Sequence, residues 1–328
     1  MTSDLLALLA CPSCGGSLTV SATAENGGSV ETGTLICTSC ASSYPIVRQI
    51  PRFVPADNYA SSFGFQWNKF RATQLDSRTG LPISRDRFFK QSRWTPAELA
   101  GKRVLDIGCG AGRFAEVALS AGAQVVAVDY SGAVDACLAN LGSNPRLSVV
   151  QADLYRLPFK PESFDYLYCF GVLQHTPDPH RAVLALPAPL KRGGKLAIDF
   201  YPRLASNVLW PKYWIRPLTR RLPRERLFAI VQWLVPKLLP IARALAAVPL
   251  LGSRLRYLMP IMMYYRVFPF TAQQHREWAI LDTFDMLAPA HDHPQTAAAV
   301  LAWLKEAGLR EPDAAREGLV VGRAMKAR

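Results

Sequence analysis

Hydrophobic and polar positions follow a regular rhythm between residues 101 and 200. Short apolar runs that suit buried strands are separated by segments in which apolar residues recur every three or four positions, as on one face of a helix. The strand-like runs are KRVLDIG, AQVVAVD, RLSVVQAD, FDYLYCF and GGKLAIDF, and the helical segments are GRFAEVALSAG, AVDACLANL and HRAVLALPAPL. This succession predicts an α/β fold with a mostly parallel sheet covered by helices.

The segments on either side of this region follow other patterns. Residues 56–100 are expected to be helical, because Phe63, Trp67 and Phe70 are spaced to share one helix face. Residues 203–270 are apolar and basic, and prolines 211, 217, 223, 236, 240, 249 and 260 are expected to cut them into short helices. Beyond them, PQTAAAVLAWLKEAGL predicts a helix that ends at Gly308, and REPDAA and GLVVGRAMK predict two short strands.

The first 55 residues carry two cysteine pairs. Cys11-Pro12-Ser13-Cys14 and Cys37-Thr38-Ser39-Cys40 are C-x-x-C turns separated by 22 residues. Each turn directs two thiolates toward one point, so together they supply the four sulfur ligands of a structural Zn²⁺ site. A redox dithiol would explain one such pair but not two. The segment, in which YPI and IPRF read as edge strands, is too small for its own core, so zinc is expected to stabilise it.

The net charge of +13 is concentrated in the segment from Arg203 to Arg266. It contains twelve Lys or Arg residues and one acid, Glu225, and therefore carries +11 of the total. So many positive charges favour a polyanion as partner, either nucleic acid or an anionic membrane surface.

The remaining cysteines and the apolar stretches bear on the compartment. Cys109, Cys137 and Cys169 lie in apolar segments and are expected to pack in the core, which together with the paired thiols suits a reducing cytoplasm. The run from Leu238 to Leu251 contains Pro240, Arg243 and Pro249 and is too short to span a bilayer. The apolar start lacks the basic residues of a cleavable signal. A cytoplasmic protein, with peripheral contact at the inner face of the membrane as a further option, is expected.

A glycine-rich turn joins the first strand of the sheet to its helix. In VLDIGCGAGRFAE, residues 104–116, the strand carries Asp106 and runs into Gly108, Gly110 and Gly112. Glycines let the backbone approach a ligand, and the following helix offers free N–H groups to an anionic group. The G-x-G-x-G spacing differs from the G-x-G-x-x-G of dinucleotide-binding enzymes. This turn is therefore the predicted cofactor site.

The motifs from Lys102 to Tyr201 resemble class I S-adenosylmethionine-dependent methyltransferases, especially the broad group that contains ubiquinone-biosynthesis methyltransferases. The residues that carry the resemblance are VLDIGCGAGRFAE, VVAVD, VQADLYRLPF, FDYLYCFGVLQHTPDP and LKRGGKLAIDFY. The resemblance implies a seven-stranded Rossmann-like core with S-adenosylmethionine as cofactor. The cysteine-rich segment likewise resembles zinc-ribbon proteins that act as small partners of RNA and protein methyltransferases.

The resemblance also implies roles for single residues. The three glycines line the methionine part of the cofactor with Asp106 near its amino group, Asp129 binds both ribose hydroxyls, and Asp153 contacts the adenine amino group. Each aspartate taken alone would serve equally well as a helix cap or turn residue. The neighbouring positions assigned to the cofactor are Cys109, Tyr130, Leu154 and Phe170.

His175, in LQHTPD just beyond a strand of the core, is the candidate general base. Methyl transfer from a sulfonium is an in-line displacement, so alignment and exclusion of water supply much of the acceleration. A histidine could accept a proton from an oxygen or nitrogen acceptor. The alternative is a histidine that only orders the loop.

Two further segments, LDTFDMLAPAHDHPQT and SFGFQWNKFRATQLDS, resemble a bacterial subgroup of zinc-ribbon methyltransferases linked to cell-envelope glycans or specialised metabolites. In that light Phe63, Gln66 and Trp67 form a lid over the cofactor, or else a helix on the sheet edge. The acids and histidines of the first segment bind the acceptor, hold a metal, or cap the next helix. The positions assigned to the substrate are Gln66, Trp67, Gln174, Tyr201, Asp282, Asp285 and His293.

The basic insertion, residues 203–270, leaves three hypotheses open. It interleaves its arginines with Trp210, Tyr213, Trp214, Trp233, Tyr257, Tyr264 and Tyr265. Helices at a membrane interface would serve a lipid-linked or glycan acceptor. Basic and aromatic residues could instead bind RNA, although runs such as LFAIVQWLV are less typical of that. A self-packing or dimer-forming subdomain is the third.

The sequence thus predicts five parts. They are a zinc ribbon (1–55), a helical connector (56–100), a cofactor-binding core (101–202), the basic insertion as a substrate lid (203–270) and the rest of the core (271–328). The expected activity is methyl transfer to an oxygen, nitrogen or carbon of a small-molecule, glycan or lipid-linked intermediate. RNA methylation and a scaffold without activity are the alternatives.

Overall fold

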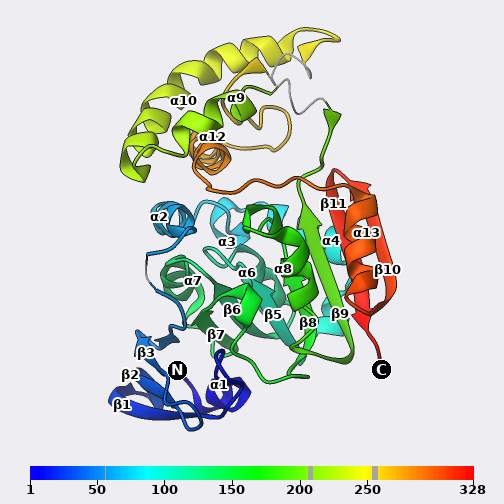
Figure 1. Cartoon of the computed structure of the whole chain (residues 1–328). Helices are drawn as coiled ribbons and strands as arrows, with labels where there is room; N and C mark the ends of the chain where they lie inside the picture. Colours follow the sequence, from blue (N-terminus) through cyan, green and yellow to red (C-terminus); the bar gives the residue numbers. More distant parts are fainter. Residues whose placement is uncertain (56, 206–209, 253–257) are drawn as a thin grey trace.

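A computed structural model of the chain describes residues 1–55, 57–205, 210–252 and 258–328. The zinc ribbon lies at one end of a central sheet, helices cover the sheet, and an arched helical layer lies at the other end (Figure 1). Arg254, Arg256 and Tyr257, counted above among the basic and aromatic residues of the basic insertion, lie outside the described residues.

The zinc ribbon consists of one short helix and a four-stranded antiparallel sheet. Its elements are α1 (Ser3–Leu8), β1 (Leu18–Asn26), β2 (Ser29–Cys37), β3 (Ser43–Val47) and β4 (Ile50–Pro51). The β1–β2 hairpin turns on Gly27 and Gly28, both at positive φ. A two-residue hairpin loop of this kind needs positive φ at both central positions, which glycine adopts without strain. The YPI and IPRF segments contribute to β3 and β4, as expected.

The zinc ribbon packs against the edge of the central sheet. Arg52 forms a parallel bridge with Gln151 of the edge strand β7 (Leu147–Gln151), and Leu9 forms an antiparallel bridge with Phe159. Leu5 and Leu35 of the zinc ribbon belong to the same hydrophobic cluster as the core of the sheet. The zinc ribbon therefore covers a sheet edge and shares its core.

The central sheet has seven strands among the described residues, in the order β10-β11-β9-β8-β5-β6-β7. They are β5 (Arg103–Ile107), β6 (Gln124–Asp129), β7 (Leu147–Gln151), β8 (Phe164–Cys169), β9 (Leu190–Phe200), β10 (Leu309–Glu317) and β11 (Leu319–Lys326). The pairs among β5 to β9 are parallel, and β11 is antiparallel to both neighbours. The expected seven-stranded, mostly parallel sheet is confirmed. Its order reverses between β5 and β8, where parallel sheets bind ligands at the carboxyl ends of the strands.

Short helices surround the sheet. They are α2 (Ser61–Lys69), α3 (Asp76–Thr79), α4 (Ile83–Ser92), α5 (Pro96–Leu99), α6 (Arg113–Ser120), α7 (Val134–Leu141), α8 (Pro179–Ala185) and α13 (Ala297–Glu306), with 3₁₀ turns η1 (Leu154–Arg156) and η2 (Leu173–His175). The prediction that Phe63, Trp67 and Phe70 share one face was wrong for Phe70. Phe63 and Trp67 line the large cavity described below, whereas α2 ends before Phe70, whose ring packs on Phe228 of the basic insertion.

The layer beyond the strands contains α9 (Pro211–Thr219), α10 (Arg224–Ala247) and α12 (Ala272–Leu287). The prediction that prolines divide the basic insertion into short helices was wrong here, because α10 continues through Pro236 and Pro240. A proline inside a helix costs about 3 kcal/mol. Packing of α10 against α12 in a hydrophobic cluster of its own offsets that cost. This layer therefore extends past residue 270, because α12 belongs to it.

One helix of the described residues, α10, is long and apolar enough to cross a membrane by length and composition alone. It has 24 residues, with a mean hydropathy of 1.4 over its most apolar stretch. The stretch from Leu238 to Leu251 was expected to be too short to span a bilayer, but α10 begins earlier, at Arg224, so this expectation was wrong on length. The core helix of a folded domain passes the same test, and one face of α10 is indeed packed on α12.

Candidate functional site

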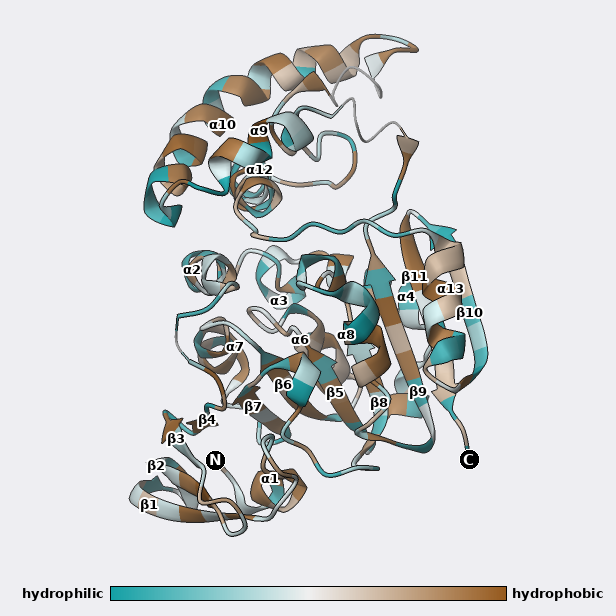
Figure 2. Cartoon of the chain, viewed as in Figure 1, coloured by the Kyte–Doolittle hydropathy of each residue, from teal (hydrophilic) through white to brown (hydrophobic). Residues whose placement is uncertain are grey.

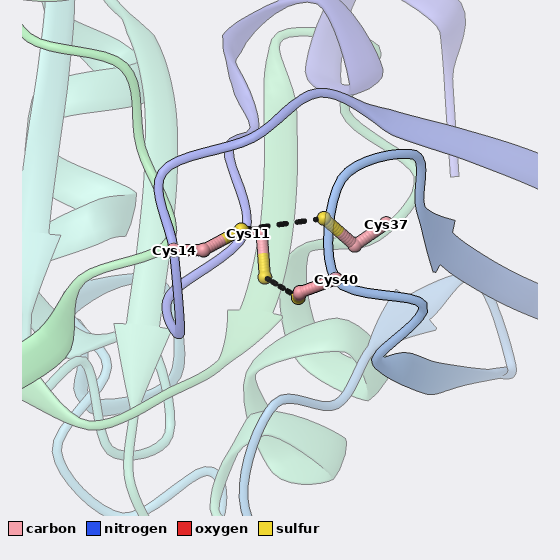
Figure 3. A group of neighbouring side chains, drawn as sticks. All are labelled: Cys11, Cys14, Cys37 and Cys40. Carbon is pink, nitrogen blue, oxygen red and sulfur yellow. Dashed lines mark hydrogen bonds between the residues drawn. The ribbon is translucent and has the colours of Figure 1, made fainter.

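The two cysteine turns of the zinc ribbon meet at one point. The four Sγ atoms lie within 4.8 Å of one another, with 3.7 Å between Cys11 and Cys40 and 3.5 Å between Cys14 and Cys37 (Figure 3). Four sulfurs placed about 2.3 Å from a tetrahedral zinc would be about 3.8 Å apart. The donor set therefore fits a closed structural zinc site, with no position left for catalysis.

Neighbouring groups support these sulfurs. The backbone N–H of Gly16 donates to Cys14 Sγ and that of Ser39 to Cys37 Sγ, each at 3.4 Å. Such donors orient the ligands of a metal and stabilise thiolates. The described residues contain no other group of three or more His, Cys, Asp and Glu side chains close enough to hold a metal. The option of a metal at the acids and histidines of residues 282–293 is therefore not supported.

The glycine turn after β5 adopts left-handed backbone conformations at Gly108, Gly110 and Gly112. A Cβ at Gly110 would come within 3.1 Å of the Trp67 indole, so α2 lies directly over the turn. A Cβ at Gly108 would overlap Val172, in the loop after β8. The turn, α2 and the β8 loop thus converge at the carboxyl end of the sheet, and Gly112 instead packs against Leu141.

Asp129, at the end of β6, presents its carboxylate to this turn. Oδ1 accepts from the backbone N–H and hydroxyl of Ser131, and Oδ2 accepts from the backbone N–H of Gly110 at 3.0 Å. A carboxylate has about four acceptor positions, so Oδ2 has capacity for one more donor such as a ribose hydroxyl. Burial raises the pKa of Asp129, and the donors from Ser131 and Gly110 oppose that rise.

Asp106 is buried beneath the turn. Its Oδ2 atom accepts no hydrogen bond among the described residues, and burial raises its pKa to about 8. The neighbouring Tyr168 hydroxyl opposes that rise. Asp153 is different, because its side chain caps η1 by accepting from the Tyr155 N–H at 2.9 Å. The cap interpretation therefore holds for Asp153 in this structure.

A cavity of about 1440 Å³ opens from the glycine turn toward the helical layer. At one end the carboxyl ends of β5, β6 and β8 and the turns after them form its wall. At the other end the wall comes from the basic insertion and α12. Twelve predicted residues line it, namely Trp67, Gly108, Cys109, Gly110, Asp129, Tyr130, Leu154, Phe170, His175, Tyr201, Asp282 and Asp285. The predicted residues that do not line it are Gln66, Asp106, Gly112, Asp153, Gln174 and His293.

His175 lies on η2, directly after the Val172 contact with the glycine turn. Its Nδ1 atom is 3.0 Å from the carbonyl oxygen of His291. A carbonyl only accepts, so in the neutral ring Nδ1 carries the proton and Nε2 carries a lone pair. Nε2 is buried and has no hydrogen-bond partner among the described residues. The ring is held by Phe63 and Tyr201 at centroid distances of 5.2 and 5.6 Å.

The residues around His291, whose carbonyl contacts His175, are anchored to the basic insertion by a buried ion cluster. Asp292 lies 3.2 Å from Lys212 Nζ and 3.4 Å from an Arg216 nitrogen, and these side chains are almost fully buried. Arg216 also donates to the Pro289 carbonyl. Burial lowers the pKa of Lys212, and the Asp292 carboxylate opposes that fall. The backbone N–H of His293 donates to the Gln174 carbonyl, which ties the same segment to η2.

Acidic side chains from α12 meet donors from distant parts of the chain. Gln66 donates to Asp285 at 3.1 Å, and the Tyr201 hydroxyl lies 3.5 Å from the same carboxylate. Tyr264 donates to Asp282. Burial, with the neighbouring Asp285 carboxylate, raises the pKa of Asp282 to about 7.

Two arginines that the sequence analysis did not single out also line this part of the cavity. Arg87 donates to Asp199 at 2.6 Å, and Arg113 donates to Ser84 and Gln74 at 2.9 Å each. Burial, together with the charge of Arg87, lowers the pKa of Arg113 to about 10. Arg113 stands one position after the glycine turn, which is the one sequence signal that could have drawn attention to it.

Comparison with known proteins identifies two parts of the chain. Residues 105–198 match the family described as a methyltransferase domain, and residues 2–48 match the family described as Trm112p-like protein. Residues 105–198 form a methyltransferase domain. The cofactor of this class is S-adenosylmethionine. Gly108, Gly110 and Asp129 line the cavity, whereas Asp106 is buried and does not.

Curated relatives of the methyltransferase domain are ubiquinone biosynthesis O-methyltransferases. The one from Xanthomonas euvesicatoria pv. vesicatoria is 36% identical over 40% of this chain and 56% of its own length. The enzyme of Thiobacillus denitrificans is 35% identical over 40% of this chain and 59% of its own. That of Idiomarina loihiensis is 38% identical over 36% and 47%. This chain thus spans about half the length of these relatives.

Solved structures that superpose on the chain include two methyltransferases. Magnesium protoporphyrin IX methyltransferase from Synechocystis PCC 6803, with bound SAH, has 16% identity and a TM-score of 0.44 over 82% of this chain and 97% of its own. The complex of the Haloferax volcanii Trm112 methyltransferase activator with a methyltransferase has 14% identity and a TM-score of 0.45 over 81% and 98%.

Proposed function

We propose that this chain transfers the methyl group of S-adenosylmethionine to an oxygen atom of a large, mostly apolar acceptor. The observation that carries the proposal is a single cavity that runs from the glycine turn past His175 into a chamber walled by the basic insertion. Pockets for one drug-sized ligand usually measure about 300–1,000 Å³. A volume of about 1440 Å³ is enough for the cofactor and a sizeable acceptor together.

The chamber beyond His175 suits an apolar acceptor with a few polar groups. Its wall includes Trp210, Leu258, Met262 and Phe268. The wall also carries polar groups, among them Arg87, Arg113, Lys212 and the acids of α12, each engaged in a hydrogen bond or ion pair. Apolar surface with a few fixed polar groups selects and orients an apolar ligand.

The residues around His175 suit the removal of a proton from a hydroxyl. S-adenosylmethionine, when bound, supplies an electrophilic methyl group on its sulfonium. His175 Nε2 would accept the proton that a hydroxyl acceptor gives up when it is methylated, with the cofactor leaving as the neutral thioether. The carbonyl of His291 accepts from Nδ1 and so selects the neutral tautomer in which Nε2 carries the lone pair. The relatives' names, which specify O-methylation, agree with an oxygen acceptor.

The test is transfer of a labelled methyl group to fractionated extracts. The full, zinc-loaded chain is incubated with methyl-labelled S-adenosylmethionine and separate lipid, glycan, small-metabolite and RNA fractions. We expect the label in an organic-soluble product that carries it as a methyl ether or a methyl ester. Label confined to RNA would overturn the acceptor assignment. Cofactor binding without transfer to any fraction would indicate a scaffold without activity.

A further inference from the structure

The surface of α10 that faces away from the protein is unusually apolar. Its inner side, with Val231 and Val235, packs in the hydrophobic cluster shared with α12. Ile230, Trp233 and Ile241 are exposed on the outer side, and the Trp233 side chain is 62% exposed. Figure 2 shows hydrophobic stretches along this helix beyond its hydrophilic N-terminal end, at the outer edge of the molecule. Both sides of α10 are therefore apolar, and only one has a protein partner among the described residues.

The exposed apolar residues are concentrated in this one layer. Eleven of the fourteen large hydrophobic side chains exposed among the described residues belong to it, and the other three lie in the zinc ribbon. The eleven, which we call the apolar patch, are Trp214, Leu218, Leu222, Ile230, Trp233, Ile241, Val248, Leu250, Leu251, Leu258 and Val267. Leu250 is 99% exposed. Large apolar patches with a polar rim mark interaction sites.

Basic side chains border the apolar patch. Arg220, Arg221, Arg226, Lys237 and Arg266 are exposed, and Glu225 is the one acid of the basic insertion. Lys237 Nζ lies 3.7 Å from the centre of the Trp233 ring. Tryptophan and long cationic side chains are the residues that hold a helix at the boundary between lipid headgroups and acyl chains.

We propose that the apolar patch docks on an anionic lipid bilayer, with α10 lying in the plane of the interface. Each exposed Arg or Lys near such a surface gains electrostatic attraction, while the apolar side chains enter the acyl boundary. A second copy of the chain would bring the same positive charges together. RNA would satisfy the arginines but would leave Leu218, Ile230 and Ile241 without apolar partners. A bilayer satisfies both sets of residues.

Docking in the plane, rather than spanning, follows from the packing of α10. If α10 spanned the membrane, its face that contacts α12 would have to separate from Ile280 and Phe284, which are both buried in the shared cluster. In the docked orientation this cluster stays intact. The apolar patch faces the lipid, and the methyltransferase domain remains on the aqueous side.

One residue of the apolar patch also lines the cavity. Leu258 is 60% exposed as a member of the patch and also lines the cavity. Trp210 and Lys212 of the same insertion line the cavity beside it. We infer, resting on the function proposed above, that a membrane-dissolved acceptor enters the chamber directly from the bilayer.

The test is co-sedimentation of the full chain with vesicles of phosphatidylcholine, alone and mixed with phosphatidylglycerol. Binding to the mixed vesicles that weakens with salt is expected. The double variant Trp233→Ser with Ile241→Ser should weaken it at least about tenfold, because two interfacial apolar anchors are lost. The matched control is Ile36→Ser in the zinc ribbon, an exposed apolar residue outside the apolar patch, which should leave binding unchanged. Both variants replace exposed side chains, and thermal unfolding verifies that they fold.

Three outcomes would overturn the inference. They are no binding to the mixed vesicles, binding that the double variant retains, and a dimer in light scattering that the double variant dissolves. Salt-sensitive RNA binding in a gel shift with no vesicle binding would assign the surface to RNA.

Turnover on a soluble short-chain acceptor separates this inference from the proposed function. If that turnover persists without vesicle binding, only the docking inference fails, and if vesicles bind while no fraction is methylated, only the proposed function fails.

Discussion

The zinc ribbon and the basic insertion both extend the methyltransferase domain, but they join it in different ways. Leu5 and Leu35 of the zinc ribbon enter the same hydrophobic cluster as Leu105 of the sheet. The basic insertion keeps its own cluster around Val231 and meets the domain mainly across a cavity. The zinc ribbon therefore completes the fold, and the basic insertion completes the site.

The polar contacts also differ between the two places where the zinc ribbon and the helical layer meet the methyltransferase domain. At the zinc ribbon, Arg52 donates to Gln151 and Asp135, which ties the residue after β4 to the edge strand β7 and to α7. At the basic insertion, carboxyls on α12 are buried beside the cavity, where burial raises the pKa of Asp282 to about 7. Such groups cost stability and persist where function needs them.

Removal of zinc is expected to have the largest effect, and it acts on the fold. Cys37→Ser, or chelation of the metal, should unfold the zinc ribbon and lower the melting temperature by about 10 °C or more, because the zinc ribbon shares its core with the sheet. Calorimetry with a parallel zinc assay measures both. Ser39→Ala in the same turn is the control and should retain zinc. An unchanged transition after zinc release would show that the two cores are independent.

Replacement of His175 should act on the chemistry and leave the fold intact. His175→Ala and His175→Gln should lower kcat by about 10²-fold or more, because Nε2 is lost as the proton acceptor. Cofactor affinity and melting temperature should stay close to those of the parent chain. Steady-state kinetics with the acceptor found above measures the effect. If kcat is unaffected and only KM changes, His175 orders the loop and no base acts at this position.

Two arginines of the zinc ribbon form ion pairs with the same carboxylate, one exposed and one mostly buried. Replacing each in turn shows whether burial strengthens the contact. Arg48 and Arg52 each lie 2.7 Å from Asp135, but their side chains are 64% and 17% exposed. Arg52→Gln should lower the free energy of unfolding by about 1–2 kcal/mol, and Arg48→Gln should change it little. Denaturant unfolding of both variants at one pH measures the difference. Equal effects would mean that burial does not decide the strength of this contact.

Asp282→Asn should reveal the cost of the buried carboxyl as a pH dependence. The folded pKa of about 7 lies above the unfolded value of 3.8, so the native state binds more protons between these limits. The parent chain therefore loses stability relative to Asp282→Asn as the pH rises through this window, by at most about 1.4 kcal/mol per pH unit. Denaturant unfolding of both chains between pH 5 and 8 measures the difference. A difference independent of pH would contradict the raised pKa.

The sequence predicted those parts of the fold and site that depend on neighbours along the chain. Cysteine turns, the glycine turn and buried strands are local patterns, and their geometry follows from a few adjacent residues. The continuous helix α10 could not be predicted from such local patterns. Pro236 and Pro240 disfavour a helix locally, and only packing against α12, which lies far along the chain, makes it continuous.

The acceptor end of the site was predicted less completely for the same reason. The acids of α12 stood out in the sequence, but their partners Gln66 and Tyr264 come from segments whose proximity only the fold reveals. Arg87 lies on a helix of the connector with no local sign of a site. His175 was recognised as a candidate, whereas the carbonyl of His291 that fixes its ring is a backbone atom and leaves no trace in residue identity.

The central claim is that S-adenosylmethionine binds at the glycine turn with its ribose on Asp129. Titration calorimetry of the full chain with the cofactor, for the parent and for Asp129→Asn, tests it most directly. The account predicts binding by the parent chain and a loss of affinity of about 10- to 100-fold in Asp129→Asn, with the melting temperature of the ligand-free chain little changed. Equal affinity in both chains, or no binding by the zinc-loaded parent, would contradict it.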